Sequence, residues 1–291
     1  MSDDAPRWFT RALAADVDTG EVEVDGATVR YRAWGPVGAP GLLLVHGGAA
    51  HNRWWDHIAP YLATGRRVVA PDLTGHGDSD HRGAYSLETW ADEVLAAAHA
   101  GGIAGPPTVV GHSMGGLVAY VAARTVGEQL GGVVIIDSPV FGRTPEDEAA
   151  RNHRAFGPIK VYPDRDDAIA HFRFVPAQDA AVPAVFAHVA ETSLQAVDGG
   201  WSWKFDPTMM ARSGDDHLGE AGARCRLAYF RAEHGIIGDD ALAEMRTRFG
   251  PAAIVAELPD AGHHAMIDRP LSLIAAVRTV LAAWDAADAT S

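Results

Sequence analysis

Hydrophobic positions change their spacing along this chain, and each change of spacing predicts a different kind of element. Near the N-terminus, residues 21–26 and 28–34 alternate polar and apolar side chains. The Asp25-Gly26 pair at their junction is typical of a two-residue turn between paired strands. We therefore expect a hairpin of half-exposed strands in this region.

Farther along, short runs rich in Val, Ile and Leu alternate with longer segments of helical spacing. The runs cover 42–46, 67–70, 108–111 and 132–137, and the helical segments include 86–100 and 114–127. Strands that are apolar on both sides and alternate with helices are typical of βαβ units, in which helices cover both faces of a parallel sheet. The pattern predicts an α/β fold with a mostly parallel central sheet.

This alternation stops after Asp137 and resumes late in the chain. Residues 140–215 contain six prolines, charged runs and scattered aromatic side chains, and they fit no strand-helix repeat. Apolar runs at 226–231 and 253–258 then return, each followed by a helical segment, 239–248 and 270–286. We expect a core built from 1–139 and 216–291, with 140–215 inserted as a lid (cap).

Composition limits the possible functions. The 291 residues are 47% hydrophobic and carry a net charge of −14, which argues against binding a nucleic-acid backbone. Cys225 is the single cysteine, so neither an intrachain disulfide nor a cysteine zinc site is expected. The polar N-terminus lacks the features of a signal peptide and no apolar stretch of about 18 residues is present, so we expect a cytoplasmic protein without a membrane span. The oligomeric state is not readable from these features.

The segment Gly111-His112-Ser113-Met114-Gly115 follows an apolar run and begins a helical one. This is the G-x-S-x-G pattern in the strand-turn-helix context that lifts a serine hydroxyl above the edge of a sheet. The sharp turn leaves no room for side chains at the two glycines. We therefore predict that Ser113 is a nucleophile.

Three further motifs each follow a predicted strand. They are His46-Gly47-Gly48 after one strand, Asp72-Leu73-Thr74-Gly75-His76-Gly77-Asp78-Ser79 after the next, and Ala261-Gly262-His263 after the last. Together with the serine motif they make residues from about 40 to 270 resemble the α/β-hydrolase superfamily, in its lidded, esterase- and lactonase-like branch with a serine nucleophile. The resemblance implies that the backbone amides of Gly48 and Met114 form the oxyanion hole.

A serine hydroxyl needs a base to remove its proton during attack. The resemblance assigns this role to His263, directly after the glycine, rather than to the adjacent His264. The family's usual acid would fall on Gly235, which has no side chain. Some relatives, including haloalkane dehalogenases and certain lactone hydrolases, place the acid at the end of the sixth strand. That position is Asp137 here, and we favour it, with Glu233 as the alternative.

The predicted lid is rich in aromatic and methionine side chains, which suit an apolar pocket above the serine. Trp201 and Trp203 project to the same side if their segment is extended, so both are candidates for substrate binding. Other members of this group form the core of the lid in the alternative interpretation. The expected partner is an apolar small molecule.

These features predict hydrolysis of a carboxylic ester or lactone through an acyl-serine intermediate. No dinucleotide-binding fingerprint and no convincing metal-ligand spacing is present in the sequence, so no cofactor or metal is expected. Three alternatives remain: hydrolysis of a C–C bond, lyase or oxygenase chemistry on the same fold, and a receptor-like protein that binds a ligand with little turnover.

Overall fold

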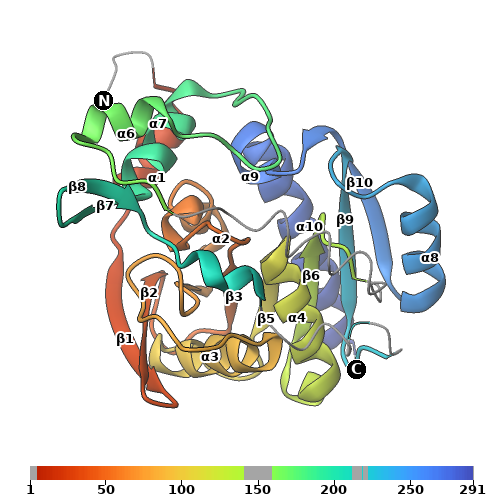
Figure 1. The fold of residues 1–291 in the computed structure, drawn as a ribbon. Coiled ribbons are helices and arrows are strands. Elements are labelled where there is room, and N and C mark those ends of the chain that lie inside the picture. The colour runs from red at the N-terminus through yellow and green to blue at the C-terminus, as the bar shows by residue number, and fades with distance from the viewer. Residues whose placement is uncertain (1–4, 141–158, 212–217, 219–221, 291) are drawn as a thin grey trace.

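The computed structural model describes residues 5–140, 159–211, 218 and 222–290. Eight strands form one sheet in the order β1-β2-β4-β3-β5-β6-β9-β10. Their bounds are β1 Asp18–Val24, β2 Ala27–Trp34, β3 Gly41–Val45, β4 Arg67–Pro71, β5 Thr108–His112, β6 Gly132–Ile136, β9 Leu227–His234 and β10 Ile254–Gly262. Only the pairings of β1 with β2 and of β2 with β4 are antiparallel. The mostly parallel sheet that the resemblance implies is confirmed (Figure 1).

The predicted hairpin is also confirmed. β1 and β2 pair antiparallel from Asp18 opposite Ala33 to Val24 opposite Ala27. Asp25 and Gly26 both have left-handed backbones, with φ of 47° and 73°. These angles are those of the turn whose twist matches two paired strands.

Alternate residues of the central strands pack on opposite faces of the sheet, as the pleat of a strand requires. Leu42 and Leu44 of β3 join one apolar cluster, and Leu43 and Val45 join the other. The first cluster includes side chains of α1 (Arg7–Leu13), α2 (Ala59–Leu62) and α10 (Pro270–Asp288). The second includes α3 (Leu87–Ala100), α4 (Met114–Thr125) and α8 (Asp239–Phe249), so helices cover both faces.

Helix α10 has the length and mean hydropathy, 1.3, of a membrane span. Its apolar residues Leu273, Val277 and Leu281 lie one helical turn apart and are buried in the first cluster. The apolar face of α10 is therefore used to cover the sheet.

The chain between β6 and β9 adds no strand to the large sheet in its described part. It forms α6 (Arg165–Ala170), α7 (Pro183–Thr192), the hairpin of β7 (Leu194–Val197) and β8 (Gly200–Trp203), and the 3₁₀ helix η3 (Pro207–Ala211). These elements lie together beside one end of the sheet (Figure 1). Two buried polar bonds join α7 and its C-cap to the core: His188 to Asp56 at 3.0 Å, and Ser193 to His51 at 2.9 Å. The predicted lid residues Phe141 and Phe156 lie outside the described residues.

Candidate functional site

Ser113 lies in the turn between β5 and α4, with a strained backbone conformation of φ 52° and ψ −118°. A non-glycine residue adopts such angles only where its surroundings enforce them. A Cβ at Gly111 would come within 2.2 Å of the Gly115 carbonyl oxygen, and a Cβ at Gly115 within 2.4 Å of the Val45 carbonyl oxygen. Both glycines are therefore required for the tight strand-turn-helix packing that the sequence predicts.

Ser113 is the first member of a hydrogen-bonded array of three side chains from three different strand ends. Nε2 of His263, in the loop after β10, lies 3.0 Å from Ser113 Oγ. Nδ1 of His263 lies 2.7 Å from Oδ2 of Asp137, which directly follows β6. Asp137 is fully buried and His263 is 4% exposed. This is the spatial arrangement of a serine nucleophile, a base and an orienting acid.

The Asp137 carboxylate is held by the segment where relatives carry their usual acid. It accepts hydrogen bonds from the backbone amides of Ala232, at 3.1 Å, and Ile236, at 2.9 Å. A Cβ at Gly235 would lie only 2.2 Å from Asp137 Oδ2. The absent side chain of Gly235 thus leaves the space that the Asp137 carboxylate fills from the neighbouring strand.

Glu233, the alternative acid, points elsewhere. It is exposed near the end of β9 and accepts a hydrogen bond from the backbone amide of Asp260 at 2.7 Å. The structure therefore does not bring Glu233 to His263. Asp239, where α8 begins, forms an ion pair with Arg231 rather than capping the helix.

The amides of Gly48 and Met114 have no hydrogen-bond partner within the part of the chain that the structure describes. His46 fixes the peptide that carries the first of them. Its Nε2 accepts from the Leu73 amide at 3.1 Å, so Nδ1 must carry the proton that is donated to the Gly47 carbonyl at 2.8 Å. Burial lowers the pKa of His46 to about 4, which keeps the ring neutral. Because the carbonyl and N–H of a trans peptide point in opposite directions, this bond turns the Gly48 N–H away from His46.

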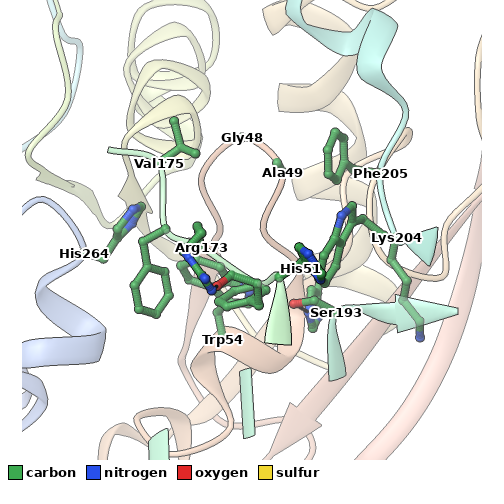
Figure 2. A pocket seen from close by; sticks show the side chains of 14 residues that line it. Gly48, Ala49, His51, Trp54, Arg173, Val175, Ser193, Lys204, Phe205 and His264 are labelled. Atoms are coloured by element: carbon green, nitrogen blue, oxygen red, sulfur yellow. Dashed lines mark hydrogen bonds between the residues drawn. The ribbon is translucent and has the colours of Figure 1, made fainter. Parts of the chain in front are cut away.

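A cavity of about 220 Å³ lies between the Gly48–Ala49 loop and the segment after α6. Figure 2 shows this loop arching over the cavity, with His264 and Val175 on one side and His51, Ser193 and Phe205 on the other. The remaining walls are mainly aromatic: Trp54, Phe172, Phe174 and Trp203. The cavity can hold an apolar group next to one of the two free amides.

The structure separates the two predicted substrate-binding tryptophans. Trp203 lines the cavity, whereas Trp201 is not among its lining residues. Both tryptophans pack against a small cluster of Tyr162, Ala168 and Leu194 inside the inserted segment, so the cavity contact of Trp203 is what distinguishes them. Two further tryptophans follow the Gly48–Ala49 loop: Trp54 lines the cavity and Trp55 is buried in the core.

The fold also brings together three histidines that the sequence analysis did not connect. The rings of His112, His263 and His264 are mutual neighbours, with centroids 4.7 to 5.4 Å apart. Each offers one ring nitrogen within 4.8 Å of the others. The adjacent pair 263–264 and the histidine preceding the nucleophile were visible in the sequence, but their proximity depends on the sheet order.

Comparisons with known proteins agree with the fold. A family model described as "Alpha/beta hydrolase family" matches residues 42–277. Lipase LipV of Mycobacterium tuberculosis is 27% identical over 87% of this chain and 97% of its own length. Esterase Rv0045c of the same organism is 27% identical over 90% of this chain and 89% of its own. The crystal structure of E-2-(acetamidomethylene)succinate hydrolase superposes with a TM-score of 0.76 at 22% identity, covering 91% of this chain and 98% of that one.

Proposed function

Because the chain belongs to the alpha/beta hydrolase family, we propose that it hydrolyses carboxylic esters, lactones included, through an acyl-serine intermediate. The observation that carries this proposal is the bonded array of Ser113, His263 and Asp137 beside two unpaired amides. The relatives named lipase and esterase, aligned over most of this chain, support the ester as the bond that is cleaved.

In the proposed reaction Ser113 Oγ attacks the ester carbonyl while His263 Nε2 takes the hydroxyl proton. The resulting oxyanion accepts hydrogen bonds from the amides of Gly48 and Met114, and each such donor lowers the barrier by roughly 3–4 kcal/mol. The intermediate collapses, and His263 returns the proton to the departing alcohol. Water then attacks the acyl-serine by the same route and releases the acid. Asp137 stabilises the imidazolium in both halves.

The aromatic cavity next to Gly48 supports an apolar acyl or alcohol group as part of the substrate. Its volume of about 220 Å³ is smaller than the 300–1,000 Å³ of a usual ligand pocket. We therefore expect esters of short or medium chain length to be cleaved faster than long-chain ones.

The test is turnover of p-nitrophenyl butyrate by the wild type, by Ser113→Ala and by Ser272→Ala, a matched change at an exposed serine on α10. Removing a nucleophilic serine costs at least about 10⁴-fold in rate, so only Ser113→Ala should lose activity. A fluorophosphonate probe read by mass spectrometry should label Ser113 alone. Turnover that persists in Ser113→Ala refutes the proposed nucleophile. Labelling without turnover of any ester or lactone in a panel favours the receptor-like or C–C alternatives.

A further inference from the structure

Three buried imidazoles lie side by side, and one of them, His264, lines the cavity. His112 precedes the nucleophile, and His263 and His264 follow β10. One nitrogen from each ring lies within 4.8 Å of one from each of the others. The ring centroids are 4.7, 4.8 and 5.4 Å apart, close to the roughly 5 Å that follows for three imidazoles around one ion with metal–nitrogen bonds of about 2.0–2.1 Å.

Two of these rings are already held in the way that ligating histidines are. His263 uses Nδ1 for the Asp137 carboxylate, and His112 uses Nε2 for the backbone carbonyl of His263 at 2.8 Å. Histidine ligands characteristically bond a carboxylate or a carbonyl through one nitrogen and the metal through the other. His112 therefore keeps Nδ1 for a ligand, whereas Nε2 of His263 is available only if a metal displaces its hydrogen bond to Ser113 Oγ.

His264 supplies an independent observation. It is 6% exposed and lines the cavity, and among the described residues its only polar neighbour beyond the other two rings is the Val175 backbone, with which neither ring nitrogen makes a hydrogen bond of normal geometry. A buried polar group without a good hydrogen bond destabilises the fold, and a bound ligand can supply the missing partner.

We propose that His112, His263 and His264 bind a divalent transition-metal ion such as Zn²⁺, and that this ion reversibly switches off the hydrolase. Imidazole suits Zn²⁺, Cu²⁺ and Ni²⁺, whereas Mg²⁺ and Ca²⁺ require oxygen ligands. The three nitrogens lie within 4.8 Å of one another, so binding requires the rings to rotate until these atoms reach the roughly 3.3 Å separation of a tetrahedral site.

Inhibition is expected because His263 would be both a metal ligand and the catalytic base. This expectation rests on the proposed function. A metal on Nε2 displaces the hydrogen bond to Ser113, and a metal on Nδ1 displaces the one to Asp137. Either way the base can no longer take the serine proton. Mg²⁺ should leave the rate unchanged at concentrations where Zn²⁺ abolishes it.

The binding test uses the untagged full-length protein and does not depend on turnover. Titration with Co²⁺ followed by visible absorption, and with Zn²⁺ by calorimetry, compares the wild type with His264→Phe and His171→Phe. Phe at 264 keeps the edge-to-face ring contact with Trp54 and removes only the unpartnered nitrogens. His171 lines the same cavity but is exposed and outside the trio, so it is the matched control.

We expect one ion per chain and a tetrahedral Co²⁺ spectrum in the wild type and in His171→Phe. His264→Phe should bind at least about 100-fold more weakly, because loss of a direct ligand exceeds the 10–100-fold cost of losing a supporting partner. Equal binding by His264→Phe and the wild type, or no binding by either, overturns the proposal.

Inhibition is then measured as each variant's rate with Zn²⁺ divided by its own metal-free rate, with reversal by a chelator. The Zn²⁺ concentration for half inhibition should rise in His264→Phe by the same factor as the dissociation constant. Tight binding without inhibition overturns the switch. A chain that shows the Co²⁺ spectrum but cleaves no ester refutes the proposed function and keeps the metal site.

Discussion

At the scale of single residues, the carboxylate of Asp137 occupies the space beside His263 that a side chain at position 235 would fill. We expect Asp137→Asn to lower kcat for p-nitrophenyl butyrate by about 10⁴-fold, because the amide favours the wrong tautomer of His263 while preserving the shape of the site. Glu233→Gln, which changes an exposed carboxylate on the adjacent strand, should keep the wild-type rate. A collapse in Glu233→Gln with an active Asp137→Asn would contradict the assignment of the acid.

The same volume allows the acid to be moved between strands. Gly235→Asp alone should be inactive and unstable, because its Cβ would overlap the Asp137 carboxylate. Asp137→Gly alone should be folded and inactive. In the double variant the carboxylate enters from position 235 into vacated space, so we expect at least about tenfold recovery over Asp137→Gly, within the range that an orienting acid supplies. A double variant no faster than Asp137→Gly would show that position 235 cannot aim an acid at His263.

The sequence was informative about residues whose role follows from local chain geometry. Ser113 and the glycines around it belong to one turn, so spacing alone predicts their arrangement. The choice between Asp137 and Glu233 depends on which strand end faces the histidine loop and on which way a strand side chain points. The contact of His112 with the 263–264 pair depends on the order of strands in the sheet, which local periodicity does not contain.

At the scale of elements, the strands and helices that are most deeply buried were the ones that the sequence predicted best. The predicted strands of the central sheet agree with the structure to within a few residues, because both of their faces are apolar. The elements between β6 and β9 are short and interrupted by prolines, so no period is long enough to identify them. Helix α1 was also missed: its seven residues bury only Phe9 and Ala12.

Strand β8 gives the element-scale prediction. Trp203 lines the cavity, whereas Trp201 packs inside the inserted segment. Trp203→Ala should enlarge the cavity and shift the kcat/KM optimum in a series of p-nitrophenyl esters toward longer chains. Trp201→Ala should cost stability, about 3–5 kcal/mol for a buried tryptophan and less here because Trp201 is half-buried, without moving that optimum. The reverse outcome would place the substrate next to Trp201 rather than next to Trp203.

At the scale of the whole molecule, buried ionisable groups link stability to pH. Burial lowers the pKa of His46 and His57 to about 4 and, with His263 nearby, that of His264 to about 3. It also lowers the pKa values of His51, His76 and His112. Asp72 shifts in the opposite sense: burial raises its pKa to about 7, although it accepts bonds from the Asn52 and Asp78 amides. Burial likewise raises the pKa values of Asp92, Glu93 and Asp268.

Below neutral pH, the buried histidines should dominate the pH dependence of the free energy of unfolding. Between about pH 6.5 and 4 the unfolded chain protonates them and the folded chain does not, so stability is lost as the pH falls through this window. As the pH falls, Asp72 is protonated in the folded chain before it is protonated in the unfolded chain. It therefore adds to the stability of the folded protein between about pH 7 and 4. Each group contributes up to about 1.4 kcal/mol per pH unit, and six histidines outnumber four acids. We therefore expect the free energy of unfolding, measured by urea denaturation, to fall by roughly 6 kcal/mol from pH 7.5 to 5.5. His57→Phe should reduce that loss by about 1.4 kcal/mol, since it removes one such histidine. A protein that becomes more stable over this interval would show that the buried acids, rather than the histidines, control its response to acid.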